Sequence, residues 1–499
     1  MVIPDGYTSA AILYMFLKRS YPDIKLNYVF HNKSKSHGLS EDLFIPEDTN
    51  LIICPDSASN DVAACKHHQE LGREIICLDH HILEVSGNPY AIIVNNQCSE
   101  NYGNKDLSAA GVVWQFCRAI DQENWTDYAD DYLDLVMLGN IADSMSILSF
   151  ETRRLIDKGM SQIKNKFMLS MLNKQSYSIG QDLNIISFQF YVVPSINGLL
   201  RFGSFEEKEL LFRAFIETDE SFEYKKKDGE MIKENIYDRA SRICVNAKAR
   251  QDREVKKSLD ILNENIEKYH FDNNKVLFVN ANDLDHSLTG LAAIKLANQY
   301  NRPCVVLRKN KDGWGGSARN VNACEIENLK EFLFDTGLFE YCNGHNSAFG
   351  VKILEKNLKP AIEKTNELLK DFNFEKVYNV DFIFQPEDIT LNLVNDFNDL
   401  KNIWGQGLSE PLVVIENIKL NTENIQLMGA DKNTWKFTLN EEGTIAIKFK
   451  CDENDKVLQI KNENWNGIDL KMNCVGKLTL SNFNGIISPQ FIINDYNII

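Results

Sequence analysis

The sequence predicts an α/β protein with a doubly wound parallel sheet, a connecting helix, a second α/β domain and a C-terminal β-barrel. Two patterns predict this architecture. In residues 1–160 and 262–380, short apolar runs alternate with stretches of helical periodicity, and strand–helix–strand units with short links build parallel sheets. After residue 411, short strands follow one another between turns, which is typical of a small barrel.

Bulk composition narrows the class of protein. At 499 residues the chain is too long for one core, and 43% hydrophobic with 25% charged residues is ordinary for a globular protein. The net charge of −17 argues against a protein that coats nucleic acid electrostatically. It leaves room for a nuclease whose cleft is locally basic or neutralised by metal. Scattered cysteines without a Cys-x-x-Cys pair, and no apolar run long enough to span a bilayer, predict a cytoplasmic protein with no membrane partner.

Four apolar runs in the first 160 residues are predicted strands. They are Met1–Ile3, Leu26–Phe30, Asn50–Cys54 and Ile75–Leu78. Helical periodicity covers Ser9–Leu17, a segment through His67 and His68, and Tyr132–Leu138. Strands and helices in this alternation predict the doubly wound sheet.

Acidic and histidine residues stand just past the ends of these elements: Asp5, Asp56, the Asp79-His80-His81 triplet and Asp143. For any one of them, a helix cap or turn residue is the ordinary interpretation. Because strand ends at one sheet edge lie close together, all of them together favour a metal site. Carboxylates and neutral imidazoles suit divalent ions such as manganese or zinc.

The order of these residues resembles a known family. Asp-Gly-x-x-Ser from Asp5, Pro-Asp-Ser around Asp56, Asp-His-His at 79–81 and Ala-Asp ending at Asp143 resemble motifs I to IV of the DHH phosphoesterase superfamily. Residues 95–113 resemble the segment between motifs III and IV. The resemblance implies that Asp5, Asp56, His80 and Asp143 hold a divalent metal. It implies further that His81 faces the substrate phosphate and that Asp79 orients the histidines.

Motif I departs from the family pattern. The family normally has His-x-x-x-Asp-x-Asp, whereas here only Asp5 matches and Ile3 stands at the middle Asp position. Either residues of the first strand are missing from this sequence, or one of two metal sites is incomplete. A two-metal mechanism would be weakened severely by the second alternative.

The middle of the chain, residues 161–261, is predicted as a helical segment and a connecting helix. Val192–Gly203 resembles a RecJ-type exonuclease segment, which implies that Asn197 and Arg201 line the path of a nucleic-acid backbone; a structural loop is the alternative. Glu223–Glu234 has the composition of a solvated loop. Residues 235–261 have helical periodicity and many basic residues, so we expect a long helix that connects two domains.

Residues 262–380 are predicted to form strands at Lys275–Val279 and Pro303–Leu307 with a helix between them. Two glycine-rich segments, Gly313–Asn320 and Asn343–Gly350, are predicted as loops, with ordinary turns as the alternative. Together they resemble the DHHA1 domain. The resemblance implies that Ser317, Arg319, Gly344 and His345 bind substrate phosphates, with His286 as a weaker candidate.

Residues 381–499 are predicted to form the barrel, with short strands that include Thr434–Leu439, Leu458–Ile460 and Leu470–Leu480. The Gly-Gln-Gly-x-x-Glu-Pro entry at 405–411 resembles the OB domain of RecJ proteins. Trp435, Phe437, Lys448 and Lys450 could bind single strands or could equally be core and rim residues.

The resemblance implies a hydrolase: an exonuclease specific for single-stranded DNA, dependent on Mn²⁺ or Mg²⁺, that works 5′ to 3′. Single-stranded DNA is the expected partner, together with single-strand-binding, replication or repair proteins. Two alternatives stay open. One is a DHH–DHHA1 phosphodiesterase that acts on short oligonucleotides or cyclic dinucleotides, and the other is an inactive accessory protein that binds single strands.

Overall fold

The computed structural model describes residues 4–30, 38–83, 87–179, 183–226, 228–321, 326–374, 376–452, 455–463, 467–483 and 486–499. Contacts divide the chain into two compact units. The first comprises residues 1–248, 384–411 and 415–499, and the second comprises residues 249–383 and 412–414. The division into four domains stays a prediction. The predicted strand at Met1–Ile3 lies outside the described residues.

A three-stranded parallel sheet forms the N-terminal part of the first unit. Its strands are β1 (Leu51–Pro55), β2 (Glu74–Asp79) and β3 (Ile92–Asn95), in the order β1-β2-β3. Pro55 pairs with Leu78, and Asp79 pairs with Asn95. The carboxyl ends of all three strands therefore lie at one edge of the sheet.

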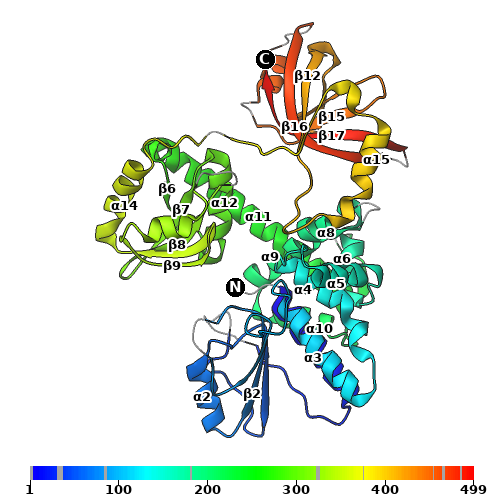
Figure 1. The fold of residues 1–499 in the computed structure, drawn as a ribbon, viewed down its shortest axis with the longest axis vertical. Helices are drawn as coiled ribbons and strands as arrows, with labels where there is room; N and C mark the ends of the chain where they lie inside the picture. Colours follow the sequence, from blue (N-terminus) through cyan, green and yellow to red (C-terminus); the bar gives the residue numbers. More distant parts are fainter. Residues whose placement is uncertain are drawn as a thin grey trace. The chain divides into compact units, whose positions relative to one another are not determined.

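Helices cover both faces of this sheet, as predicted (Figure 1). Cys54, Ile75 and Cys77 pack with Ala64 and Cys65 of α2 (Val62–Glu70) on one face. On the other face, Leu78 joins a core built by α1 (Pro4–Ser20), α3 (Ala109–Asn124) and α4 (Leu133–Ala142). Nearly every residue of α4 is buried, because α1, α3 and α5 all pack against it.

The predicted strand at Leu26–Phe30 is wrong. Alternate residues Leu26, Tyr28 and Phe30 are half-buried, as in a strand, and the Tyr28 ring lies 4.9 Å from that of Phe212. No described residue pairs with the segment as a neighbouring strand, however. A groove of about 960 Å³, lined by this segment, α1 and β1, lies beside it. An apolar alternation predicts a strand only where a partner supplies backbone hydrogen bonds, and here the described chain supplies none.

Helices continue the first unit. They are α5 (Phe150–Ser161), α6 (Lys166–Lys174), α7 (Ser176–Ile179), α8 (Ile185–Ser187), a π-helical turn (Phe188–Val192), α9 (Val193–Phe202) and α10 (Phe205–Phe215). The structural-loop alternative for Val192–Gly203 is thus wrong, since most of it is α9.

The charge-rich segment 223–234 is a hairpin, not the predicted loop. Its strands are β4 (Ser221–Lys225) and β5 (Met231–Asn235). The Arg242 guanidinium lies 3.9 Å from the ring centre of Tyr224. This cation–π contact stabilises the hairpin although its sequence is polar. The predicted connecting helix is α11 (Ile236–Tyr269), longer than expected. Within the part of the chain that the structure describes, no helix has the length and apolarity to cross a membrane.

The second unit holds a five-stranded sheet in the order β6-β7-β8-β10-β9. The strands are β6 (Leu277–Asn280), β7 (Cys304–Asn310), β8 (Gly313–Arg319), β9 (Phe339–His345) and β10 (Ala348–Ile353), and the helices are α12 (Thr289–Tyr300), α13 (Leu329–Phe334) and α14 (Glu355–Leu368). Both glycine-rich segments were predicted as loops and lie mainly in strands. A Cβ on Gly316 would collide with the carbonyl of Val306 on β7, so glycine here allows close strand pairing rather than a turn.

The C-terminal residues 382–498, most of which belong to the first unit, hold a seven-stranded sheet in the order β11-β12-β16-β17-β15-β14-β13. The strands are β11 (Phe382–Phe384), β12 (Val413–Asn421), β13 (Gln426–Met428), β14 (Thr434–Thr438), β15 (Ile445–Lys448), β16 (Asp469–Phe483) and β17 (Ile486–Ile498), with α15 (Leu391–Asp399) beside them. The closed barrel is not seen, because β11 and β13 end the sheet and no described pairing joins them. Trp435 and Phe437 are buried core residues, which favours that alternative over base stacking.

Leu458–Ile460 was predicted as a strand and lies in α16 (Lys456–Asn462). Asp455 explains the difference, because its carboxylate accepts hydrogen bonds from the backbone of Val457 and Leu458 and so begins the helix. The same carboxylate binds Trp435 Nε1 at 3.1 Å, the Tyr496 hydroxyl at 2.9 Å and Lys448 Nζ at 2.9 Å. Although burial raises the pKa of Asp455, the Lys448 ammonium and the hydrogen bonds hold it below its usual value.

Asp455→Ala should lower the free energy of unfolding of the C-terminal sheet by about 2 kcal/mol, because it leaves the partly buried Lys448 ammonium unpaired and removes the cap of α16. Since the pKa of Asp455 is lower in the folded state, its contribution is full above about pH 4 and is lost as the pH falls through the folded-state pKa. Urea unfolding at pH 7 and pH 3 measures both effects. Asp431→Ala, which removes an exposed carboxylate in the turn between β13 and β14, is the control. Equal losses in the two variants would contradict the prediction.

Candidate metal centre

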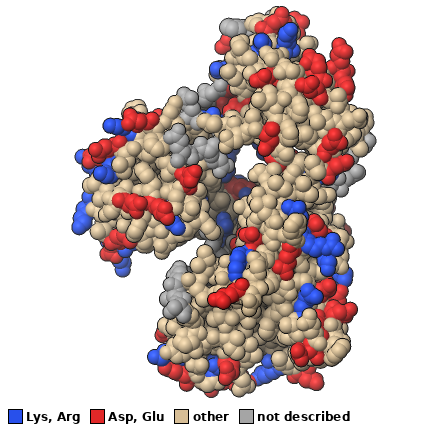
Figure 2. Space-filling view, viewed as in Figure 1, with Lys and Arg blue, Asp and Glu red and all other residues tan. Residues whose placement is uncertain are grey.

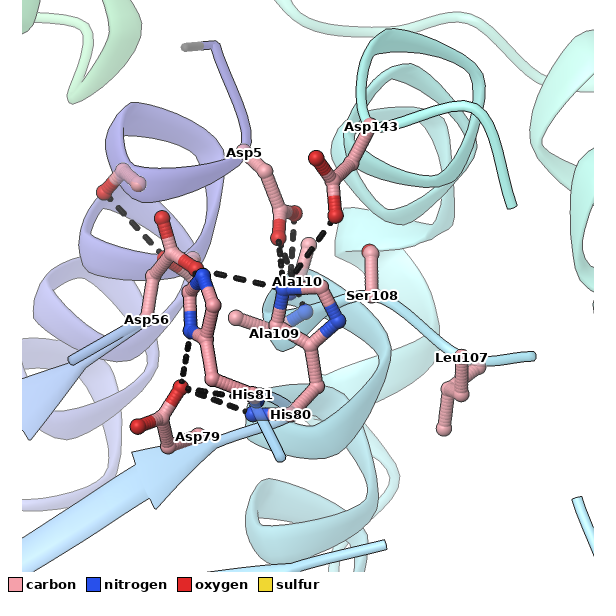
Figure 3. Close-up of polar contacts among 12 residues, drawn as sticks. Asp5, Asp56, Asp79, His80, His81, Leu107, Ser108, Ala109, Ala110 and Asp143 are labelled. Carbon is pink, nitrogen blue, oxygen red and sulfur yellow. Dashed lines mark hydrogen bonds and ion pairs between the residues drawn. The ribbon is translucent and has the colours of Figure 1, made fainter. Parts of the chain in front are cut away.

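The predicted ligands come from two strand ends and two helices. Asp56 directly follows β1, and His80 and His81 directly follow β2, at the shared carboxyl edge. Asp5 lies in the first turn of α1, and Asp143 is the residue that ends α4. Figure 3 shows these side chains turned toward one another. The structure therefore brings together Asp5, Asp56, His80 and Asp143.

His80 lies at the centre of this cluster. Its Nε2 is 3.2 Å from Asp143 Oδ2, 3.4 Å from Asp56 Oδ1 and 3.9 Å from Asp5 Oδ2. Asp5, Asp56 and His80 are buried, and Asp143 is partly exposed. Potential ligand atoms of Asp5, His80 and Asp143 all lie within 4.8 Å of one another, and so do those of Asp56, His80 and His81.

Three carboxylates in so small a space repel one another. Burial raises the pKa of Asp5 to about 7, and the negative charges of Asp56 and Asp143 add to the shift. Burial lowers the pKa of His80, but the adjacent carboxylates of Asp56, Asp5 and Asp143 outweigh this effect and raise the pKa to about 9. The cluster thus needs positive charge, from a proton or a cation.

A divalent cation fits these residues. Among the described residues, Asp56 Oδ1 and His80 Nε2 are buried and have no hydrogen-bond partner. Buried polar atoms in native proteins are normally paired, and a bound cation would give both of these atoms a partner. Carboxylate oxygens with one imidazole nitrogen are donors that Mn²⁺ and related ions accept.

Asp5 is fixed by the N-terminus of α3. Its Oδ2 accepts a hydrogen bond from the Ala109 N–H at 2.8 Å, and its Oδ1 accepts one from the Ala110 N–H at 3.0 Å. These amides belong to the first turn of the helix, where the partial positive charge favours an anion. α3 therefore orients the Asp5 carboxylate.

Asp79 and His81 form a hydrogen-bonded pair at the edge of the cluster, and His81 Nδ1 also lies 3.9 Å from Asp56 Oδ1. Asp79 Oδ1 accepts hydrogen bonds from the His80 N–H at 2.8 Å, the His81 N–H at 3.3 Å and His81 Nδ1 at 2.7 Å. Burial raises the pKa of Asp79, but its bonds to His81 hold it well below the usual value. The same hydrogen bond raises the pKa of His81. Asn95 donates to the His81 carbonyl at 2.9 Å, so the turn after β2 is held on both sides.

The backbone at Asp56 is strained. Its φ is 57°, in the left-handed region, and Ala58 has a φ of 77°. Asp tolerates this conformation better than most residues. Such strain is concentrated at functional sites. Gly6 makes room for the resulting side-chain position, because a Cβ there would lie 3.0 Å from Asp56 Oδ2.

Asn95, Gly139 and Asn140 have no predicted role, yet all three support the site. A Cβ on Gly139 would lie 2.4 Å from Asp5 Oδ1, so glycine is required where α4 crosses α1 and α3. Asn140 is fully buried and bonds to the N-terminus of α3. The sequence marks Gly139 and Asn140 only as a small and a polar residue within the otherwise apolar run that leads to Asp143.

Asn197 and Arg201 lie on α9 of the first unit, one turn apart and outside the cluster. α9 packs on α11, where a Cβ on Gly198 would lie 2.8 Å from Lys248 Cα. Burial lowers the pKa of Arg201.

In the second unit, the candidate substrate residues lie at one end of the sheet. Arg319 on β8 pairs with Ala348 on β10, which pairs with His345 on β9, so both side chains lie on one sheet face. Ser317 lies on the same face and shares a hydrogen bond of 2.9 Å with Thr289. Gly344 has a φ of 137°, and Gly290 leaves space for the Arg319 guanidinium. His286 precedes α12.

Known proteins match both ends of the chain. Residues 4–140 match the model of the DHH family, N-terminal domain, and residues 380–495 match the RecJ OB domain. YorK of Bacillus subtilis (strain 168), named as an SPbeta prophage-derived single-strand DNA-specific exonuclease, is 36% identical over 506 residues, which cover 99% of this chain and 86% of YorK.

More distant relatives share the fold. The single-stranded-DNA-specific exonuclease RecJ of Bacillus subtilis is 26% identical over 98% of this chain and 60% of its own length. The structure of RecJ from Thermus thermophilus in complex with Mn²⁺ superposes with a TM-score of 0.71 at 17% identity, over 99% of this chain and 67% of that protein. The chain therefore belongs to the DHH family, in the group that contains YorK and RecJ.

Proposed function

We propose that the protein is an exonuclease specific for single-stranded DNA, and that it hydrolyses phosphodiester bonds from the 5′ end. The cluster of Asp5, Asp56, His80 and Asp143 is the observation that carries the proposal, because its carboxylates and imidazole are donors that a divalent cation accepts. The relationship to YorK and RecJ supports the substrate.

The proposed cofactor is Mn²⁺ or Mg²⁺, held by Asp5, Asp56, His80 and Asp143. When bound, such an ion polarises phosphoryl oxygens and makes water more acidic. The first turn of α3 orients Asp5, so its carboxylate is already in position before the cation binds. Asp79 keeps a proton on His81 Nδ1 and so turns the other ring nitrogen toward the proposed position of the scissile phosphate.

DNA binding is proposed to come from local sites rather than from overall charge. On the face in Figure 2, basic side chains are mixed with acidic ones, in keeping with the net charge of −17. Ser317, Arg319, Gly344 and His345 are proposed to bind backbone phosphates in a DHHA1-like domain, and Asn197 and Arg201 to line the strand's path. The C-terminal sheet is proposed as a further single-strand-binding surface, in a cytoplasmic protein that works with other repair or replication proteins.

The activity is tested by digesting 5′- and 3′-labelled single-stranded DNA with Mn²⁺. The proposal predicts that 5′-labelled DNA releases labelled mononucleotide at once and that Asp143→Ala lowers the rate by at least about 1,000-fold, since it removes a ligand of the charge-stabilising ion. Cleavage of dinucleotides alone would support the short-oligonucleotide alternative. Binding of single strands without cleavage would support the accessory alternative.

The roles of the two histidines are separated by isothermal titration with Mn²⁺. His80→Ala should weaken binding by more than about 100-fold, because His80 Nε2 faces three carboxylates. His81→Ala should change the affinity by less than about fivefold, because its Nδ1 bonds Asp79, yet should slow cleavage by about 100-fold. Equal loss of Mn²⁺ in both variants would make His81 a ligand.

Arg319→Ala should raise the KM for single-stranded DNA by about 10-fold or more with a smaller effect on kcat, because the planar fork of arginine binds phosphate in two places. Arg319→Lys should restore only part of the affinity. Lys359→Ala removes an exposed cation of α14 and serves as the control for net charge. An unchanged KM in Arg319→Ala would remove Arg319 from the binding site.

A further inference from the structure

Asn140 joins the two helices on which the arrangement of the metal cluster depends. It lies on α4, three residues before Asp143, and is fully buried. Its Oδ1 accepts a hydrogen bond from the Ser108 N–H at 3.1 Å, and its Nδ2 donates to the Val136 carbonyl at 2.9 Å. One side chain therefore connects the residue that precedes α3 to the preceding turn of α4.

The N-terminus of α3 is capped in an unusual way. Ser108 occupies the N-cap position, but its hydroxyl makes no capping bond, and its buried Oγ has no hydrogen-bond partner among the described residues. Three amides at the start of the helix are instead bonded by side chains from other helices. Asn140 binds the N–H of Ser108, and Asp5 binds those of Ala109 and Ala110.

Three consecutive amides thus bind one residue from α4 and one from α1. Asp143 and Asp5, two of the proposed ligands, lie on these same helices. At Gly139, next to Asn140, a Cβ would lie 2.6 Å from the Ala110 Cβ and 2.9 Å from Thr8 Oγ1, so the helices are in direct contact here. A small shift of α3 relative to α4 would move Asp5 relative to Asp143.

We propose that Asn140 is a positioning residue for the metal centre. Its amide holds the N-terminus of α3 against α4, so that Ala109 and Ala110 present Asp5 at the distance from Asp143 and His80 that one cation requires. Both hydrogen-bonding groups are needed for this role, since the acceptor holds α3 and the donor fixes the side chain to its own helix. The inference rests on the proposed metal site and goes beyond its ligands.

The chain offers a matched control at Asn165. This asparagine is also buried, caps α6 by accepting from the Met168 N–H at 3.2 Å, and donates to the Phe215 carbonyl at 2.9 Å. It makes the same kinds of bonds in the same unit but touches no candidate ligand. Asn165→Ala therefore reproduces the loss of a buried asparagine cap without changing the position of Asp5.

The experiment compares Mn²⁺ affinity, by isothermal titration, with thermal unfolding in the absence of metal. Asn140→Ala should raise the Kd for Mn²⁺ by about 10- to 100-fold, as loss of groups that orient metal ligands does. Both Asn140→Ala and Asn165→Ala should lower the Tm of the metal-free protein, by similar amounts. Asn165→Ala should nevertheless leave the Kd for Mn²⁺ within twofold of the wild type. The difference in Kd at comparable Tm is a result that a merely structural role for Asn140 would not give.

Asn140→Ser covers the case in which Asn140→Ala does not fold. The serine hydroxyl can still donate to the Val136 carbonyl but is too short to reach the Ser108 N–H, so it should raise the Kd as well. A Kd within twofold of the wild type in the folded Asn140 variants would overturn the role of Asn140 alone. A wild-type chain that binds no Mn²⁺ would overturn the metal site itself, and with it the inference.

Discussion

Repulsion among three carboxylates around one imidazole is the constraint on which the first unit depends. Asp5, Asp56 and Asp143 approach a single nitrogen of His80 within 3.9 Å, and two of them are buried. Folding alone would not favour such an arrangement, because each buried charge costs free energy. The surrounding structure holds it through rigid elements: two parallel strands that end side by side, and helices that lock together at Gly139. The repulsion lowers the folding stability of the protein without a cation. A cation relieves this repulsion, and for that reason it binds strongly.

Much of the site could be predicted from sequence because its residues follow element ends. Asp56 and the Asp79-His80-His81 triplet interrupt apolar runs, and such interruptions are visible without a structure. Asn140 was not identified, because a single polar residue in an apolar helix has no spacing that marks its partner. Its significance lies in a contact with Ser108, 32 residues away in sequence, which only the tertiary fold creates.

Two of the wrong fold predictions share one physical cause. Leu26–Phe30 has a strand pattern without a described partner, whereas Gly313–Asn320 has a loop composition and lies in a sheet. In both cases the deciding factor is the neighbouring segment, since strands are stabilised by backbone bonds to others. Local capping explains Leu458–Ile460, where Asp455 begins a helix that apolar content alone did not predict. Long periodic segments such as α11 were predicted well, because a helix satisfies its own backbone.

The groove beside β1 has a consequence for handling the protein. Within the described residues β1 ends its sheet, and the side chain of Leu51 is 46% exposed beside the apolar residues that line the groove. An accessible strand edge with apolar neighbours is a template for pairing with another extended polypeptide. In concentrated solutions, protein molecules should therefore associate through this strand edge. Repulsion between their acidic surfaces should not prevent this association, because physiological salt screens it.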